Sequence, residues 1–247
     1  MPPPPTFDVR LVAARALSPS VRELTFERND GAAFVFEPGQ WVSFVLTSGG
    51  TEIRRSYSIA SFPNGTPRFD VTVTHVLGGP GSSLLHAMQP GAHLTAIGPQ
   101  GFFTRPLAGA HPSLFVATGT GVTPFRSMLG AALAAGDRTP IWLLFGVRRE
   151  EDLLYREELA DLAAAHPHFR VVPTLSQPTG TDWGGRRGYV QTHVRALFEE
   201  LAAAPESGGR LPHAYICGLQ RMVGSVRELL RKEMSLPRER VHTERYD

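Results

Sequence analysis

Cysteine is nearly absent from this chain of 247 residues, which contains Cys217 alone. A single cysteine excludes an internal disulfide, and it excludes an iron-sulfur cluster held by the chain's own thiolates, because such a cluster needs several. No apolar run approaches the roughly 20 residues that a membrane span requires. Charge is nearly balanced, at a formal +2, which is too weak an excess to indicate nucleic-acid binding. The nine histidines are scattered without metal-ligand spacing, so no metal site is predicted.

The overall composition is typical of a globular protein, with 42% hydrophobic and 19% charged residues. The length predicts one or two domains. The start, residues 1–5, has neither the apolar core nor the cleavage site of a signal peptide, and we expect it to form a polyproline or disordered arm. From these features we expect a cytoplasmic protein with no membrane span, and we expect it to be monomeric.

The pattern of apolar and turn-forming residues changes near residue 108. Before it, short β-type runs separated by Gly, Pro and Asn turns predict an antiparallel barrel with one short helix. After it, apolar runs alternate with helical stretches, which predicts a Rossmann-like parallel α/β domain. The fold class is therefore all-β plus α/β, with domains at 1–108 and 109–247. The expected strands are 8–14, 21–27, 41–46, 55–60, 69–76, 93–97, 114–117, 141–145, 170–174 and 214–217, and the expected helices are 82–87, 125–135, 151–165 and 220–234.

The segment Arg55-Ser56-Tyr57-Ser58 combines a cation, an aromatic ring and two hydroxyls in an extended run. Alternation places Arg55 and Tyr57 on one face of a strand and Ser56 and Ser58 on the other. An arginine can clamp a diphosphate bidentately while a tyrosine packs on a flat ring, which suits a flavin nucleotide. Taken alone, the segment also suits an ordinary strand.

A second signal is the run 117–129, in which a strand-like segment leads through glycines into a helix-like stretch. Gly119 and Gly121 permit a backbone course that a Cβ would hinder, and Pro124 suits the first turn of a helix. Backbone amides at such a helix start can hold a phosphate. The run lacks the third glycine of the dinucleotide fingerprint, and alone it also suits a tight connection.

In this order the two segments resemble the ferredoxin-NADP reductase family. Four further stretches extend the resemblance, namely 36–42, 78–86 with the turn 90–91, 217–223 and 242–246. The resemblance implies an FAD-binding barrel followed by an NAD(P)-binding domain, with the flavin between them. It also implies an enzyme that exchanges hydride with NADPH and single electrons with ferredoxin or flavodoxin. FAD is preferred over FMN because the whole diphosphate loop is present.

On the flavin side, the resemblance implies that Arg55 binds the diphosphate and Tyr57 stacks on the isoalloxazine. Ser58 would place its hydroxyl near the N5 atom that accepts hydride, since a hydroxyl both donates and accepts. The other residues assigned to FAD are Ser56, His75, Val76, Gly79, Gly81, Ser82 and Ser83. No chemistry is assigned to His75, and the two serines also suit the N-cap of the short helix.

On the nicotinamide side, the resemblance implies that Cys217 packs beside the reactive ring. Glu244 would hydrogen-bond near the serine of the flavin motif and relay protons, and Tyr246 would cover the flavin and move aside. The predicted catalytic set is thus Ser58, Cys217, Glu244 and Tyr246. An extra residue, Asp247, makes Tyr246 the penultimate residue. Whether Tyr246 stacks on the flavin is therefore left open. The nicotinamide set also contains Thr118, Gly119, Thr120, Gly121, Thr123, Pro124, Gly218, Leu219 and Met222.

The choice of nicotinamide depends on cations that could hold a 2′-phosphate. Candidate residues follow the expected strands, and they are Arg148, Arg149, Ser176, Arg186, Arg187 and Tyr189. NADPH-using relatives have a Ser-Arg pair where this chain has Ser176 and Gln177, so one expected positive charge is missing. Two basic positions remain, and NADPH is therefore favoured, with NADH as the alternative. Two rival functions stay open: an NADH-preferring flavin, ferric or cytochrome reductase of the same family, and a non-enzymatic binding module on the same fold.

Overall fold

The computed structural model describes residues 3–180 and 182–246. Two compact units emerge. The first contains the chain up to Arg105 together with Thr123–Ala131, and the second contains Pro106–Val122 and the chain from Ala132 onward. The first boundary between the two units follows Arg105, three residues before the domain boundary expected at residue 108. Within the described ranges no helix is both long and apolar enough to cross a membrane. Asp247 lies outside the described residues, so its effect on Tyr246 remains a prediction.

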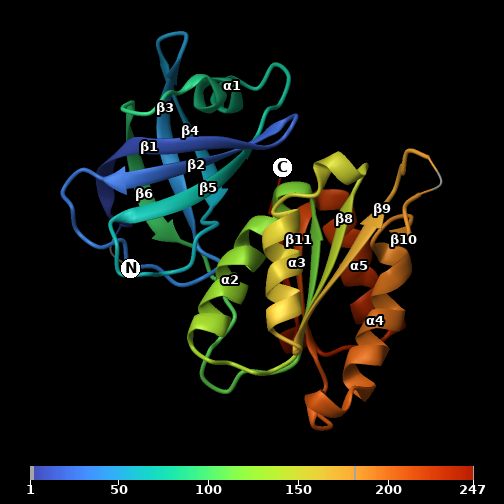
Figure 1. Ribbon diagram of the computed structural model, residues 1–247. Coiled ribbons are helices and arrows are strands. Elements are labelled where there is room, and N and C mark those ends of the chain that lie inside the picture. Colours follow the sequence, from blue (N-terminus) through green and yellow to red (C-terminus); the bar gives the residue numbers. More distant parts are fainter. Residues whose placement is uncertain (1–2, 181, 247) are drawn as a thin grey trace. The chain divides into compact units, whose positions relative to one another are not determined.

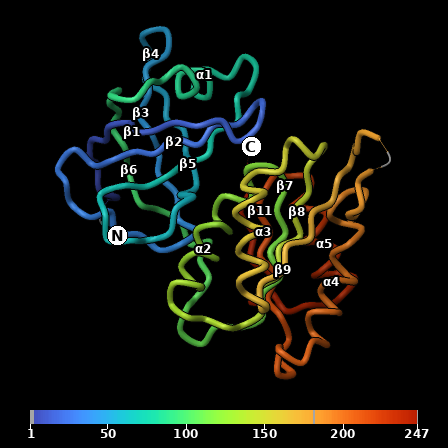
Figure 2. Tube along the Cα trace, viewed as in Figure 1, coloured from blue at the N-terminus to red at the C-terminus, as the bar shows by residue number. Residues whose placement is uncertain are grey.

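The first unit is an antiparallel barrel in which the strands follow the order β4-β3-β6-β1-β2-β5 (Figure 1). A bridge between Ile59 and Val71 joins the two outer strands of this order and closes the sheet. The strands are β1 (Thr6–Ser18), β2 (Val21–Arg28), β3 (Trp41–Ser48), β4 (Thr51–Ser58), β5 (Arg68–Thr74) and β6 (His93–Gln100). Helix α1 (Pro80–Ala87) lies beside β3 and β4 (Figure 2).

Aromatic side chains fill the interior of the barrel. The rings of Phe26 and Phe44 have centroids 4.7 Å apart, and those of Phe34 and Phe69 are 4.4 Å apart. All four are 2% exposed or less, so the alternating apolar positions of these strands point inward. This core gives β4, the strand with the Arg-Ser-Tyr-Ser segment, a fixed support.

The second unit contains a parallel sheet with the order β10-β9-β8-β7-β11-β12. Its strands are β7 (Ser113–Thr118), β8 (Ile141–Val147), β9 (Phe169–Leu175), β10 (Arg186–Arg187), β11 (His213–Leu219) and β12 (Val241–Tyr246). Helices α4 (Gln191–Ala203) and α5 (Gln220–Glu228) bury one sheet face, where Leu114, Val116 and Ile216 meet Val194 and Val223. Helix α3 (Arg156–Ala165) packs along β9 (Figure 1). The carboxyl ends of the parallel strands therefore meet at one edge.

Several elements differ from the sequence-based expectation. The expected helix 151–165 is divided into a 3-10 turn (Glu150–Asp152) and α3, because Tyr155 adopts a left-handed backbone with φ 55°. Strand β5 ends at Thr74, so His75 and Val76 follow the strand. The glycine run forms a 3-10 turn (Gly119–Val122) before α2 (Thr123–Ala134). Helix α5 continues as a π turn (Leu229–Glu233), and α4, β10 and β12 were not expected.

Candidate active site

In the first unit, the Arg-Ser-Tyr-Ser segment occupies the last four positions of β4. Arg55 and Ser56 are exposed, Tyr57 is half-buried, and Ser58 is 5% exposed. The Tyr57 ring lies 6.0 Å from the Phe44 ring. Burial raises the pKa of Tyr57 to about 12, and the Arg55 charge opposes this rise. The phenol therefore stays neutral at physiological pH and presents an uncharged ring.

Arg55 contacts the start of helix α1. A Cβ on Gly81 would lie 2.6 Å from Arg55 Cγ, so glycine is needed for the two elements to approach this closely. Arg55 donates a hydrogen bond to the Arg54 carbonyl at 2.7 Å, and among the described residues it forms no ion pair. Its charge is thus available to an anion beside the first turn of α1, where unpaired backbone amides gather.

The loop leading into α1 forms hydrogen bonds with Ser82, which lies in the first turn of this helix. Ser82 Oγ accepts a hydrogen bond from the Val76 amide at 3.1 Å and also contacts the carbonyl oxygen of Gly79 at 3.1 Å. Ser83 Oγ lies 3.4 Å from His75 Nε2. The N-cap of α1 is Gly79, without a side-chain cap, so neither serine takes the capping position considered above. The structure therefore groups His75 and Gly79 of this loop with Ser82 and Ser83 in the first turn of α1, next to Arg55.

Helix α2 contributes an arginine that the sequence did not single out. Arg126 donates a hydrogen bond to the Ala60 carbonyl at 3.1 Å and lies 3.5 Å from Asp70 and 3.8 Å from Glu23. Ser127 donates to the Ser61 carbonyl at 2.6 Å. These contacts tie the beginning of α2 to the chain directly after β4. A sequence signal was present in the adjacent Arg-Ser pair, but its partners Ala60, Asp70 and Glu23 are all distant in the sequence.

In the second unit, the glycine turn packs against the end of β11. A Cβ on Gly121 would lie 2.3 Å from the Cys217 carbonyl oxygen, so this position requires glycine. Gly119 adopts φ 53°, which favours glycine for its backbone. The hydroxyl of Thr118 is buried without a hydrogen-bond partner among the described residues. A buried hydroxyl of this kind is open to a ligand.

Cys217 and Glu244 meet because β11 and β12 run parallel in register. Cys217 pairs with Glu244, and Leu219 pairs with Tyr246. The fully buried Cys217 thiol donates to Glu244 Oε2 over 3.9 Å. Burial raises the pKa of Cys217 well above its ordinary value, the Glu244 charge raises it further, and a hydrogen bond with the Tyr246 side chain opposes the rise. The thiol is therefore protonated, and it serves as a neutral donor.

The turn after Cys217 is also tightly packed. Gly218 has φ 145°, and a Cβ there would lie 2.3 Å from Thr118 Oγ1 and 3.0 Å from Met222 Cε. Leu219 is 65% exposed. The structure thus brings Thr118, Gly121, Cys217, Gly218 and Met222 together at the carboxyl ends of β7 and β11.

The residues considered for a 2′-phosphate lie at the ends of neighbouring strands. The Ser176 amide donates to the Val147 carbonyl at 3.0 Å, and the Gln177 amide donates to the Arg148 carbonyl at 2.9 Å. Strand β10, which is Arg186–Arg187, pairs with the end of β9. Arg149 lies 3.7 Å from Glu151, whereas Arg148 forms no ion pair within the described part of the chain. Tyr189 is 67% exposed.

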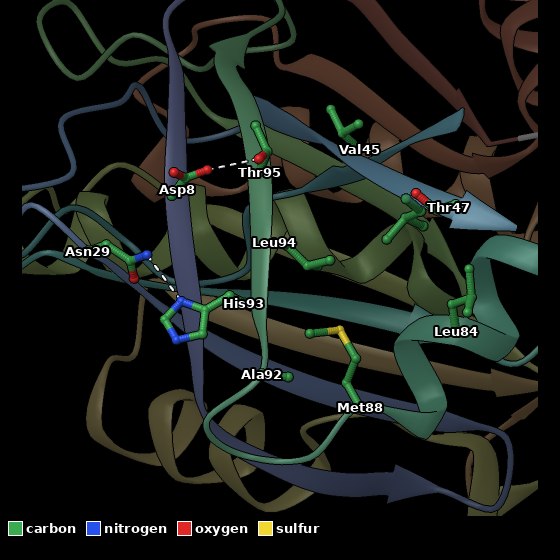
Figure 3. A pocket seen from close by; sticks show the side chains of 11 residues that line it. Asp8, Asn29, Val45, Thr47, Leu84, Met88, Ala92, His93, Leu94 and Thr95 are labelled. Atoms are coloured by element: carbon green, nitrogen blue, oxygen red, sulfur yellow. Dashed lines mark hydrogen bonds between the residues drawn. The ribbon is translucent and has the colours of Figure 1, made fainter. Parts of the chain in front are cut away.

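A separate hollow of about 580 Å³ lies on the barrel between β1, β3, β6 and α1 (Figure 3). Asp8 accepts a hydrogen bond from Thr95 there at 2.8 Å, and Asn29 lies 3.1 Å from His93 Nδ1. Four of its polar side chains are thus paired with one another. None of the predicted flavin residues lines this hollow, so it is not part of the candidate site.

The fold and these two groups of residues define a flavin- and nicotinamide-dependent oxidoreductase class, and the comparisons with known proteins agree. The family description "Oxidoreductase FAD-binding domain" matches residues 8–104, and "Oxidoreductase NAD-binding domain" matches residues 115–228. Ferredoxin-NADP reductase B of Sorangium cellulosum is 59% identical over 98% of both chains. NADH-cytochrome b5 reductase 1 of Candida glabrata is 31% identical over 89% of this chain and 76% of its own.

Among solved structures, a ferredoxin NADP+ reductase from Neisseria gonorrhoeae with bound FAD and NADP matches with a TM-score of 0.81. It is 21% identical, and the match covers 97% of this chain and 98% of that one. This likeness supports the fold. Several further relatives are longer, and this chain spans 56 to 65% of their length.

The chain belongs to the ferredoxin-NADP reductase family. The predictions of the family, of the barrel and parallel α/β fold, and of an oxidoreductase with FAD- and nicotinamide-binding domains are confirmed. The residues present fit both cofactors. Arg55 forms no ion pair within the described residues and lies beside the α1 start, and the buried hydroxyl of Thr118 has no hydrogen-bond partner among the described residues at the glycine turn. The roles of individual residues remain predictions.

Proposed function

We propose that this protein is an NADPH-dependent flavoenzyme that exchanges electrons with a one-electron carrier of the ferredoxin or flavodoxin type. The observation that carries the proposal is the meeting of Cys217 with Glu244 and Tyr246 at the ends of β11 and β12. Support for the acceptor comes from the 59% identical relative named as a ferredoxin-NADP reductase. We further propose that residues 1–108 and 109–247 act as the FAD and nicotinamide domains.

Arg55 would hold the diphosphate of FAD together with the amides of the loop around Gly79 and Gly81. The Arg55 guanidinium lies beside the α1 start and forms no ion pair within the described residues, which supports this role. Tyr57 would pack on the isoalloxazine as a neutral ring, and Ser58 would present its hydroxyl to the flavin. When bound, FAD supplies the conversion between two-electron hydride transfer and single-electron transfer.

Cys217 would border the nicotinamide as a neutral thiol and orient it, rather than act as a nucleophile. Its raised pKa supports this role, since a thiolate would repel the electron-rich reduced ring. Glu244, which accepts a hydrogen bond from the thiol, would hold or pass on a proton. Tyr246 would cover the flavin ring until nicotinamide replaces it.

The preference for NADPH would depend on Arg148, Arg149 and the β10 arginines. Their grouping at the ends of β8, β9 and β10 supports a site for the 2′-phosphate, with Ser176 adding a hydroxyl. We also propose that the protein acts in the cytoplasm as a monomer, which size-exclusion chromatography with light scattering would test.

The central experiment is a stopped-flow comparison of NADPH and NADH with the FAD-loaded protein, followed by steady-state assays with the host's ferredoxins. We expect a higher kcat/KM with NADPH and reduction of at least one ferredoxin. A colourless protein that FAD cannot reconstitute would refute the enzyme function. Arg55→Ala should lose FAD, whereas Cys217→Ala should keep FAD and transfer hydride more slowly.

The second candidate is an NADH-preferring reductase of a flavin, ferric complex or cytochrome. Gln177 favours it, because this residue removes a cation from the position beside Ser176. The 31% identical NADH-cytochrome b5 reductase is a relative with that activity in its name. Equal or better use of NADH, combined with failure to reduce every ferredoxin tested, would favour this candidate.

A further inference from the structure

His193 lies in the first turn of helix α4 and contacts both arginines of strand β10. Its Nδ1 atom lies 3.4 Å from a guanidinium nitrogen of Arg186, and its Nε2 atom lies 3.0 Å from the Arg187 carbonyl oxygen. The hydroxyl of the fully buried Thr174 lies 3.3 Å from the same Nε2 atom. A half-buried histidine outside the predicted nicotinamide set therefore connects α4 to the residues considered for a 2′-phosphate.

The partners of His193 fix which of its ring nitrogens carries the proton. A guanidinium only donates hydrogen bonds, so Nδ1 accepts from Arg186 through its lone pair. A carbonyl oxygen only accepts, so Nε2 carries the proton and donates to Arg187. The Thr174 hydroxyl donates to the Gly188 carbonyl at 2.8 Å, which leaves its oxygen as a second acceptor for Nε2. His193 is thus a neutral imidazole that offers one lone pair to Arg186.

This contact orients the Arg186 guanidinium without neutralising its charge. Within residues 3–180 and 182–246 Arg186 forms no ion pair, and its side-chain partner is the uncharged imidazole. A carboxylate in the same place would cancel the positive charge, whereas a neutral acceptor engages one N–H and leaves the others for an anion. An arginine that is already oriented also loses less rotamer freedom when it binds, so it binds an anion more tightly.

The backbone of β10 is held by contacts that do not involve the Nδ1 atom of His193. The two residues of the strand pair with Thr174 and Leu175 of β9. The Trp183 indole donates a hydrogen bond to the Arg186 carbonyl at 2.7 Å. The Nδ1 contact therefore acts on the Arg186 side chain, while the strand itself depends on these other bonds.

We propose that His193 is a positioning residue that strengthens the preference for NADPH by orienting Arg186 toward the 2′-phosphate of the nucleotide. This proposal rests on the proposed function, in which the β10 arginines hold that phosphate. His193 acts through Arg186 rather than on the nucleotide. Because NADH has a hydroxyl in place of the 2′-phosphate, it gives the oriented guanidinium no anion. The effect of His193 is therefore confined to the binding of NADPH and NADP+.

Two amide substitutions separate the roles of the two ring nitrogens. His193→Asn places an amide oxygen near the position of Nδ1 and keeps an acceptor for Arg186. His193→Gln reaches the position of Nε2 and keeps a donor for the Arg187 carbonyl, but it offers no acceptor at Nδ1. A structural role in holding β10 would be preserved by glutamine, whereas the proposed role would be preserved by asparagine.

The test measures equilibrium binding of NADP+ and NAD+ by calorimetry, and stopped-flow reduction by NADPH and NADH, on the FAD-loaded full chain. In His193→Gln we expect the Kd for NADP+ and the KM for NADPH to rise about threefold to tenfold, as for an arginine that has lost its preset orientation. The limiting rate of flavin reduction and the constants for NAD+ and NADH should stay unchanged. His193→Asn should retain the wild-type preference for NADPH.

His166→Gln is the matched control, since His166 is also half-buried but precedes β9, whereas His193 contacts the carboxyl end of β9 at Thr174. It should leave every constant unchanged. Arg186→Ala should weaken NADP+ binding by itself, and adding His193→Gln to it should have no further effect.

The proposal is overturned if His193→Gln binds NADP+ like the wild type, or if His193→Asn loses as much affinity as His193→Gln. It is also overturned if Arg186→Ala keeps the wild-type affinity for NADP+, or if His193→Gln weakens NADP+ binding further in the Arg186→Ala background. A wild-type protein that uses NADH as well as NADPH would refute the NADPH dependence in the proposed function, and this inference with it.

Discussion

Replacing Arg126 with alanine would remove a cation that two carboxylates of the barrel share. Arg126 is 18% exposed and lies 3.5 Å from Asp70 and 3.8 Å from Glu23. Glu23 keeps Arg15, which is 2.6 Å away, whereas the Asp70 carboxylate keeps a single side-chain partner among the described residues, the Thr25 hydroxyl at 2.8 Å. The replacement therefore leaves Asp70 as a half-buried charge without a nearby cation, and it also removes the hydrogen bond to the Ala60 carbonyl.

The expected loss of unfolding free energy is about 3 kcal/mol, at the lower end of the range for breaking a buried ion pair because these two distances are long. For a unit of this size the loss corresponds to a Tm lower by roughly 10 °C. Differential scanning calorimetry of the FAD-loaded protein would measure it. The thermal unfolding transition of the barrel should shift to a lower temperature.

The pH dependence sharpens this test. Burial already raises the pKa of Asp70, the charge of Glu23 raises it further, and the Arg126 charge opposes this. Without Arg126 the pKa of Asp70 in the folded chain rises further. At pH values between 3.8, the ordinary pKa of an aspartate, and this raised pKa, the folded chain therefore binds more protons than the unfolded chain. The deficit of the variant should therefore shrink as the pH falls. A second replacement, Asp70→Asn, should recover part of the Tm.

Arg138→Ala, an exposed site without an ion pair in the described structure, should leave the Tm unchanged. The reasoning is refuted if Arg126→Ala has the wild-type Tm, or if Asp70→Asn lowers the Tm of the variant still further.

Three further predictions concern the second unit. Burial lowers the pKa of His242 below 6.5, so the unfolded chain takes up this proton first and the free energy of unfolding should fall as the pH drops below about 6.5. In urea titrations His242→Gln should weaken this fall, and an unchanged pH profile would contradict the assignment. Gly121→Ala should slow reduction by NADPH while FAD stays bound, because the new Cβ would lie 2.3 Å from the Cys217 carbonyl oxygen; normal stopped-flow rates would refute the packing argument. Iodoacetamide should modify Cys217 at least about tenfold more slowly in the folded protein than in urea, because the buried thiol stays protonated; equal rates by mass spectrometry would disprove this.

The strands and the flavin segment could be predicted from the sequence because their signals are local. Alternation in β4 and the apolar run of β7 each depend on a few consecutive residues. Strand β7 formed where expected, whereas β4 begins at Thr51 and ends at Ser58, before the expected end at residue 60. Strand β12 was missed because Val241–Tyr246 is mostly polar and lies at the sheet edge, where only one side is paired. The two-residue β10 is too short to have a pattern.

The contacts within the site were not predictable in the same way. Gly121 was read as a turn residue, but its requirement for glycine comes from Cys217, which is distant in the sequence. The partners of Arg126 likewise lie on β2 and β5, and nothing near Arg126 in the sequence identifies them. Pairings of this kind depend on how the strands are ordered, and the local sequence does not encode that order.

The register of β12 determines which of its side chains meets Cys217. Parallel pairing with β11 turns Glu244 toward the Cys217 thiol. Because neighbouring strand residues face opposite sides, Arg245 points away from this thiol and lies on the side of helix α5. A chain that lacked this strand would therefore lose the hydrogen bond between Cys217 and Glu244.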